Sequence, residues 1–281
     1  MNFGIYANLT KDLNGLETKK VYNSLVNLLL NEDNLFLSND LKSLEIDGNY
    51  VNNEILFKSC DIVILLGGDG TILHIAELAS KYKTKILALN LGSRGFLTEI
   101  PPKDLNKILK DVLKGIYCLD KRFMIKAKIK NQTYIGLNDV VVSRGSSKAG
   151  CFYIYINDFL VDKYTSDGVI VSTPTGSTAY NLSSGGPILA PDVSALVITP
   201  IAAHSLHTRP LVVNSNNIIK IEANKISTKA QLNVDGVDVC TLNNRESVKI
   251  TKSTNSLLFI RTETYNYYDR FLDKLLNWVL I

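Results

Sequence analysis

Two glycine-rich segments hold most of the side chains that could do chemistry in this chain. The first reads Gly-Gly-Asp-Gly-Thr at residues 67–71 and directly follows the apolar run at residues 62–66. The second spans residues 167–187 and combines glycine and proline with many serine and threonine hydroxyls. Glycine allows the backbone to approach a phosphate or a ribose closely, and a carboxylate or hydroxyls stand beside it in both segments. The two segments together predict an enzyme that handles nucleotides.

Asp69 is the unusual member of the first segment, because a carboxylate repels phosphate. It would suit a turn that faces a hydroxyl group or a metal ion. The alternative is that Asp69 simply caps the helix predicted to follow it. The segment lacks the Gly-Lys-Ser/Thr of a P-loop and the G-x-G-x-x-G of dehydrogenases, which argues against both classes. The candidate phosphate-binding residues are Gly67, Gly68, Gly70 and Thr71.

The first segment resembles the phosphate-handling motif shared by NAD kinases, diacylglycerol-type lipid kinases and, more distantly, phosphofructokinases. Other segments favour the NAD kinases. Residues 90–99 resemble their N-x-G-x-x-G-F-L-T-[DE] stretch, Asn138 and Asp139 resemble their Asn-Glu pair, and residues 167–187 resemble their glycine-rich motif. The chain is thereby identified as a member of the bacterial type, which uses ATP or polyphosphate.

The resemblance implies a reaction and a role for each matching residue. Asp69 would be the general base on the 2′-hydroxyl of the adenosine ribose of NAD, which ATP or polyphosphate phosphorylates to give NADP. Asn138 and Asp139 would hold the nicotinamide-side ribose. A divalent cation, usually Mg²⁺, would arrive with ATP and need no protein metal cage. The implied NAD-binding residues are Asp69, Gly70, His74, Asn138, Asp139, Thr165, Asp167, Thr175, Thr178, Ala179, Tyr180, Asn181, Leu182, Ser183 and Ala202.

Some of these residues would also fit a role outside the site. His74 could be an ordinary surface histidine, and Asp139 could merely face solvent. The hydroxyls of residues 173–178 could serve their own backbone, although their density favours a ligand. The chain also departs from the family pattern, with Thr165 in place of an arginine, Asp139 in place of a glutamate and Val237 in place of a glutamine. A lipid kinase and a non-catalytic NAD-binding regulator remain as alternative functions.

The first half of the chain must position the first motif. Residues 1–116 alternate strand and helix patterns, which predicts a Rossmann-like parallel sheet with helices over its faces. The glycine turn would then lie at the carboxyl end of the sheet, where open α/β folds bind ligands. The predicted strands are 3–7, 61–66 and 85–90, and the predicted helices are 18–30, 71–81 and 102–113, the last with Pro102 at its start.

The second half changes to the period of two that is typical of β-strands. It predicts a many-stranded antiparallel β domain over residues 117–264. A helix over 265–281, with Tyr268, Phe271, Leu275 and Trp278 on one face, is expected to return to the first domain. The predicted strands are 122–130, 134–142, 152–156, 159–163, 169–172, 195–199, 211–213, 218–222, 231–234, 237–242, 247–251 and 256–261.

Composition and charge limit the kinds of molecule that the chain is expected to bind. The net charge is only +4 and basic residues are scattered, so nucleic acid is not expected. Four widely spaced cysteines, no signal-peptide pattern and no apolar stretch of membrane-spanning length predict a cytoplasmic protein without membrane contact. The family resemblance and the many strand edges predict a homo-oligomer, a dimer or a homotetramer, that completes each NAD site.

Overall fold

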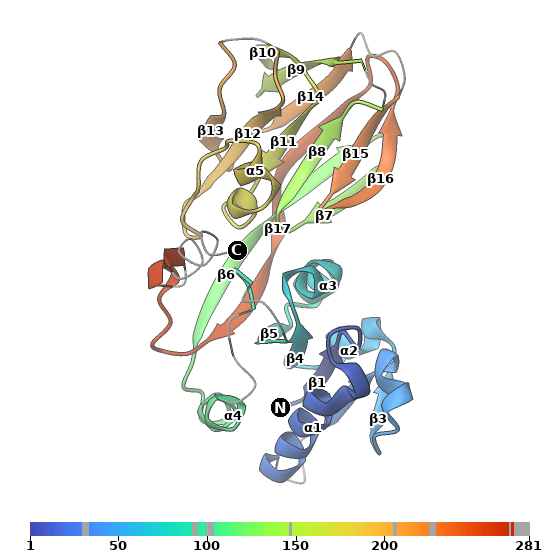
Figure 1. Ribbon diagram of the computed structural model, residues 1–281, viewed down its shortest axis with the longest axis vertical. Coiled ribbons are helices and arrows are strands. Elements are labelled where there is room, and N and C mark those ends of the chain that lie inside the picture. Colours follow the sequence, from blue (N-terminus) through green and yellow to red (C-terminus); the bar gives the residue numbers. More distant parts are fainter. Residues whose placement is uncertain are drawn as a thin grey trace. The chain divides into compact units, whose positions relative to one another are not determined.

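A computed structural model describes residues 1–29, 34–91, 95–98, 100, 104–145, 148–204, 207–224, 229–269 and 271–272. The chain forms two compact units (Figure 1). Met1–Lys121 and Leu257–Ile281 form the α/β unit, and Arg122–Ser256 forms the β unit. Each unit has its own buried apolar cluster.

The α/β unit is built on a parallel sheet. Its strands are β1 (Phe3–Ala7), β2 (Leu35–Ser38), β3 (Asn49–Val51), β4 (Ile62–Gly67) and β5 (Lys85–Asn90), in the order β5-β4-β1-β2-β3. All of β1 and β4 is buried, as expected for central parallel strands with near-continuous apolar sequence. The helices are α1 (Leu16–Leu28), α2 (Asn53–Ser59), α3 (Asp69–Tyr82) and α4 (Leu105–Leu113), with 3₁₀ turns at Leu13–Gly15 and Asn39–Leu44.

The β unit contains two antiparallel sheets that share one apolar core. One sheet has the order β13-β12-β11-β8-β15-β16, and the other contains β10-β9-β14-β17 together with β6 and β7. The strands are β6 (Cys118–Ile129), β7 (Gln132–Gly136), β8 (Asp139–Ser143), β9 (Gly150–Ile156), β10 (Phe159–Ser166), β11 (Gly168–Ser172), β12 (Ala195–Ile201), β13 (Leu211–Asn214), β14 (Ile219–Asn224), β15 (Ala230–Val234), β16 (Val237–Leu242) and β17 (Ser247–Arg261), with a 3₁₀ turn at Gly176–Thr178 and a short helix α5 (Tyr180–Ser183).

Two predicted strand boundaries were wrong. The strand expected over 134–142 is interrupted between β7 and β8, because the N–H groups of Leu137 and Asn138 donate to a side chain, the carboxylate of Asp235. Conversely, β17 runs unbroken through residues 252–255, the gap between the two strands predicted over 247–251 and 256–261. Ser253 in that segment is buried, and serine and threonine tolerate extended backbone, so tertiary packing outweighs the local signal.

Other parts of the sequence prediction also differ from the structure or lie outside the described residues. Strands β2 and β3 and helix α2 were not predicted at all. Pro102 lies outside the described residues. Of the predicted C-terminal helix, residues 267–269 and 271–272 are helical, whereas Leu275 and Trp278 lie outside the described residues. No helix in the described part of the chain is both long and apolar enough to span a membrane.

Candidate functional site

The first glycine turn joins β4 to α3. Gly68 is the N-cap of the helix, and its N–H donates to the Thr71 hydroxyl oxygen at 3.3 Å. A Cβ on Gly67 would lie 2.3 Å from that same oxygen, so only glycine fits the turn. Behind it, apolar residues recur at helical spacing and bury one face of α3, which fixes the turn at the carboxyl end of the sheet. Gly70, by contrast, faces open space.

The Asp69 carboxylate does not cap its own helix. Thr71 N–H donates to the Gly68 carbonyl instead. The carboxylate accepts the N–H groups of Phe96, Leu97 and Thr98 at 2.7, 3.1 and 3.2 Å, and the Thr98 hydroxyl at 3.3 Å. The helix-cap alternative for Asp69 was therefore wrong. Residues 96–98, which hold the carboxylate in place, belong to the 90–99 stretch singled out in the sequence analysis.

Two further residues support this contact. A Cβ on Gly95 would lie 1.7 Å from Asp69 Oδ1, so the close approach requires glycine. Arg261, at the end of β17 and 2% exposed, donates to the Leu97 carbonyl at 3.0 Å and to Asp120 Oδ2 at 3.1 Å. Leu97 thus accepts from a buried arginine and donates to Asp69, which ties the Asp69 carboxylate to the core of the α/β unit.

An open cleft of about 430 Å³ adjoins the glycine turn. It brings together Gly70, Thr71 and His74 from α3 with the segment that follows β1, where Asn8 Nδ2 donates to Thr71 Oγ1 at 3.4 Å. Lys11 belongs to the same segment, and its ammonium is so placed that a Cβ on Gly68 would lie 2.6 Å from Nζ. The complete lining of the cleft is Tyr6, Ala7, Asn8, Leu9, Thr10, Asp40, Gly70, Thr71 and His74.

Asn8 and Lys11 were not among the site residues predicted from the sequence. The signal was available, because both residues follow the carboxyl end of a predicted parallel strand, the edge at which open α/β sheets bind ligands. Thr71 and His74 give the cleft hydroxyl and imidazole groups, and Lys11 gives the neighbouring turn a positive charge. The partial positive charge at the N-terminus of α3 adds to the attraction for an anion.

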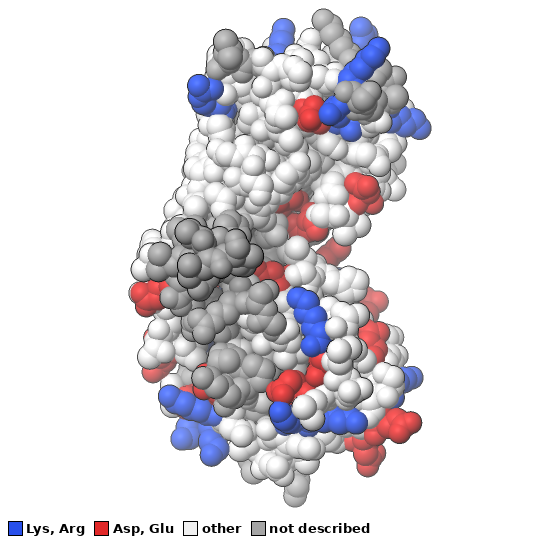
Figure 2. Space-filling view, in the orientation of Figure 1, with Lys and Arg blue, Asp and Glu red and all other residues white. Residues whose placement is uncertain are grey.

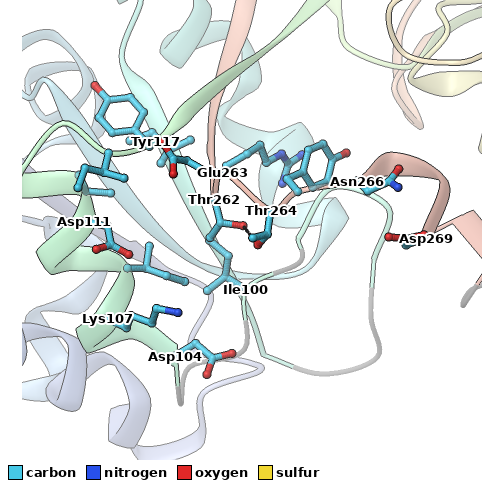
Figure 3. A pocket seen from close by; sticks show the side chains of 16 residues that line it. Ile100, Asp104, Lys107, Asp111, Tyr117, Thr262, Glu263, Thr264, Asn266 and Asp269 are labelled. Atoms are coloured by element: carbon cyan, nitrogen blue, oxygen red, sulfur yellow. Dashed lines mark hydrogen bonds between the residues drawn. The ribbon is translucent and has the colours of Figure 1, made fainter.

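A larger cavity of about 530 Å³ in the same unit lies between α4 and the segment after β17 (Figure 3). Its lining carries the four carboxylates of Asp104, Asp111, Glu263 and Asp269, against Lys107 and Arg261. Arg261 is already bonded to Asp120 and Leu97. An excess of negative charge opposes a polyphosphate, so size alone does not make this cavity the nucleotide site.

In the β unit, Asn138 and Asp139 lie at the break between β7 and β8. The Asn138 carbonyl accepts Thr173 N–H at 2.9 Å, and the Thr173 hydroxyl donates to the Leu137 carbonyl at 2.6 Å. Gly176 packs against the Asn138 carbonyl so closely that a Cβ there would lie 2.1 Å from its oxygen. The structure thus brings together the Asn-Asp pair and the start of the second glycine-rich segment.

Asp139 is buried, with 4% of its surface exposed, so the solvent-facing alternative was wrong. Burial, and secondly the nearby Asp235 carboxyl, raise the pKa of Asp139 to about 7. Burial likewise raises the pKa of Asp235, against the opposing effect of three backbone N–H donors. A carboxyl group that titrates near neutral pH in a buried site is a candidate functional group.

We expect Asp139→Asn to stabilise the protein more at pH 8 than at pH 5. Because the folded state raises the Asp139 pKa, its contribution to the free energy of unfolding is greatest below the unfolded-state pKa and is lost as the pH rises through about 7. Asparagine carries no charge at either pH. The gain at pH 8 should exceed that at pH 5 by roughly 1–3 kcal/mol in urea unfolding. A gain equal at both pH values, or one shared by the exposed-site variant Asp238→Asn, would contradict the assignment.

The hydroxyls of the second glycine-rich segment mostly serve the backbone of the segment itself. Ser177 Oγ donates to the Pro174 carbonyl at 2.6 Å and Thr178 Oγ1 to the Thr175 carbonyl at 3.3 Å. Thr175 is buried and its hydroxyl accepts from Arg122 at 3.5 Å. These hydrogen bonds support the less favoured alternative from the sequence, in which the hydroxyls serve their own backbone. The hydroxyls shape the loop that leads into α5.

Within α5 the predicted NAD-binding residues differ in exposure. Asn181 is fully buried and its side chain donates to the Ser177 and Pro187 carbonyls, both at 3.0 Å, while it accepts from Thr199 Oγ1 at 2.6 Å. The Asn181 side-chain amide therefore has a structural role, because it links Ser177, Pro187 and Thr199. Tyr180 and Ser183 are exposed, and Ala179 and Leu182 are partly buried.

Thr165 lies near the end of β10, Asp167 lies between β10 and β11, and Ala202 directly follows β12. Asp167 forms an ion pair with Arg144, with Oδ1 2.7 Å from Nε and Oδ2 3.0 Å from the second guanidinium nitrogen. This pairing with Arg144 was not predicted from the sequence, where Thr165 stands in place of an expected arginine. The Thr165 carbonyl accepts His204 N–H at 2.9 Å. Ala202 has a φ of 46°, a left-handed conformation that is uncommon for alanine and concentrates at functional sites.

Comparisons with known proteins agree with this organisation. A model of the N-terminal domain of ATP-NAD kinases matches residues 17–117, and a model of their C-terminal domain matches residues 137–262. The NAD kinase of Caldanaerobacter subterraneus subsp. tengcongensis is 40% identical over 281 residues, covering 97% of this chain and 98% of that protein. The chain belongs to the NAD kinase family.

Other NAD kinases and solved structures extend the match. The NAD kinase of Legionella pneumophila is 37% identical over 268 residues, which cover 92% of this chain and 91% of that protein. The crystal structure of yeast NADH kinase complexed with NADH matches 99% of this chain and 87% of that chain, with a TM-score of 0.87 and 26% identity. An NAD kinase from Archaeoglobus fulgidus in complex with ATP shares the fold, with a TM-score of 0.78, 24% identity and 98% of both chains covered.

Membership of the NAD kinase family confirms the fold class predicted from the sequence and makes the chain a phosphotransferase. It also favours the NAD kinase activity over the lipid-kinase and regulator alternatives.

Proposed function

We propose that this NAD kinase transfers the γ-phosphoryl group of ATP, or a phosphoryl group of polyphosphate, to the 2′-hydroxyl of the adenosine ribose of NAD. The proposal rests chiefly on the Asp69 carboxylate, which is fixed beside the glycine turn by four hydrogen bonds from residues 96–98. A fixed carboxylate can orient a substrate hydroxyl and accept its proton late in a loose phosphoryl transfer. Because a carboxylate offers about four acceptor positions, a substrate hydroxyl would take the place of one of the present donors.

The donor phosphates would lie against the glycine turn. Gly67 and Gly68 let the backbone approach, the N-terminus of α3 offers a partial positive charge, and Lys11 adds a full one. His74 and Thr71 line the adjoining cleft. Asn138 and Asp139 are proposed to accept hydrogen bonds from a ribose of NAD, with the loop before α5 beside them.

A divalent cation is expected to arrive with ATP. The described residues contain no group of three or more His, Cys, Asp or Glu side chains placed to hold a metal ion. Mg²⁺ keeps several waters and is commonly held through substrate phosphates and one or two carboxylates, so the donor set fits a cation carried by the nucleotide. The bound cation would neutralise charge on the transferred phosphoryl group.

The direct test is NADP formation from NAD, ATP and Mg²⁺, followed with an NADP-specific dehydrogenase. Parallel reactions replace ATP by polyphosphate, or NAD by NADH or by diacylglycerol vesicles. We expect NADP in the presence of NAD and no phosphorylated lipid. Lipid phosphorylation without NADP would support the alternative instead.

We propose that the chain forms a homo-oligomer through the edges of the β unit. The edge strands β10 and β13 expose apolar side chains, with Phe159 76% and Val212 47% exposed. An exposed apolar edge strand is a surface on which another chain can pair, and a second copy of this chain is one way to cover it. The described Lys and Arg side chains on the face seen in Figure 2 occur in separate groups rather than in the stripe that nucleic acid requires.

Sedimentation at micromolar concentration should give the mass of two or four chains. Phe159→Asp combined with Val212→Lys should shift the protein toward the single chain of 31.1 kDa. Val26→Lys, which changes an apolar residue 51% exposed on α1, is the matched control and should leave the mass unchanged. A wild-type protein that is monomeric and fully active at assay dilution would refute the oligomer proposal.

A further inference from the structure

The β-hairpin turn at Asp235 and Gly236 is bonded to the Asn138–Asp139 segment in an unusual way. Asp235 Oδ2 accepts the N–H of Leu137 at 2.6 Å, and Oδ1 accepts the N–H groups of Asn138 and Asp139 at 2.7 and 3.0 Å. In return, Asp235 N–H donates to the Asp139 carbonyl at 3.1 Å. One carboxylate thus accepts hydrogen bonds from three consecutive backbone N–H groups.

The surrounding residues are shaped for this contact. Asp235 has a φ of 50° and Gly236 a φ of 84°, as expected for the two central residues of a tight hairpin turn. A Cβ on Gly136 would lie 2.8 Å from Val234 Cγ1 and 3.0 Å from Asp235 Oδ1, so glycine admits the turn. On its other side, the same segment is held by Thr173 and Gly176. Asn138 and Asp139 are therefore clamped between two loops.

We propose that Asp235 is a positioning residue for substrate binding, which sets the backbone of residues 137–139 so that Asn138 and Asp139 meet a ribose of NAD. The inference rests on the proposed function of that pair. The hairpin turn alone does not require a carboxylate at position 235, because asparagine would serve the left-handed turn equally well. The three N–H donors of residues 137–139 explain why position 235 carries a carboxylate, because charge-assisted hydrogen bonds are about twice as strong as neutral ones.

The decisive variant is Asp235→Asn, which keeps the size of the side chain and the turn conformation but removes one acceptor and the charge. Amide hydrogen exchange should accelerate at residues 137–139 and remain unchanged in the rest of the β unit. The KM for NAD should rise at least ~10-fold, the usual consequence of losing about 1.4 kcal/mol of positioning hydrogen bonds, with kcat and the KM for ATP changed less than ~3-fold. Asp238→Asn, which removes an exposed carboxylate from β16, should behave as wild type.

A pH series gives a second readout. Burial and the Asp235 carboxyl raise the pKa of Asp139, and Asp235 is the charged neighbour that contributes to this shift. Removing its charge should move the pH midpoint of NAD binding to lower pH, which a loss of folded protein would not do.

Each result decides a different point. Faster exchange at residues 137–139 with an unchanged KM for NAD would make the contact structural and overturn the inference. A lower Tm with reduced kcat and an unchanged KM would do the same. If the wild type forms no NADP and does not bind NAD in calorimetry, the proposed function fails and the substrate role of Asp235 fails with it. An active wild type with an unaffected variant refutes the inference alone.

Discussion

Asp69→Asn is expected to lower kcat for NADP formation by at least ~10²-fold, the usual scale of general base catalysis, while NAD still binds. Asparagine keeps the shape and one acceptor oxygen but cannot take the proton of the ribose hydroxyl. The loss should therefore appear in kcat and leave the dissociation constant for NAD within a few-fold. Steady-state kinetics and calorimetry on the same preparation provide the two measurements.

The structure adds a necessary control to this experiment, because Asp69 also anchors residues 96–98. Thr98→Val removes one hydroxyl donor from the carboxylate without changing the volume of the side chain or the charge of Asp69. We expect it to retain most of the wild-type kcat. If Thr98→Val loses as much activity as Asp69→Asn, then anchoring rather than proton transfer explains the loss. Near-normal kcat in Asp69→Asn would refute the general-base role directly.

The elements that carry a strong local pattern could be predicted from the sequence. Strands β1 and β5 have the predicted bounds, and the glycine turn precedes α3 at the edge of a parallel sheet as expected. These elements are determined by residues close together in the sequence. The strands follow a continuous apolar run, and the turn and helix follow glycines succeeded by apolar residues at helical spacing. Short elements without such runs, such as β3 over Asn49–Val51, could not be predicted, because pairing with a neighbouring strand, here β2, decides their conformation.

The partners of the candidate site residues could not be predicted, since they are distant in sequence. Asp69 meets residues 96–98, Arg144 meets Asp167, and Asp235 meets residues 137–139 nearly one hundred positions away. Each contact joins a charged side chain to a partner that nothing in the local sequence indicates. The residue types of the site followed from motifs, whereas its hydrogen bonds depend on how the sheets bring loops together.

Gly176→Ala is expected to impair NAD binding severely. A Cβ on Gly176 would lie 2.1 Å from the Asn138 carbonyl oxygen and 2.5 Å from its carbon, and both are backbone atoms that cannot rotate away. The loop or the Asn138–Asp139 segment must shift, at a cost of roughly 1–3 kcal/mol for overpacking. The KM for NAD should rise at least ~10-fold, because misplacement by about 1 Å is enough to weaken a positioned contact by that amount or more.

Thr173→Val separates this displacement from a simple loss of stability. Valine keeps the volume of Thr173 but removes the hydroxyl that donates to the Leu137 carbonyl and accepts from Gly176 N–H. It loosens the same loop without pushing on Asn138, so Tm should fall in both variants while the KM for NAD rises much more in Gly176→Ala. Equal increases in KM would show that loop stability, rather than the position of Asn138, governs binding. An unchanged KM in Gly176→Ala would remove Asn138 from the NAD site.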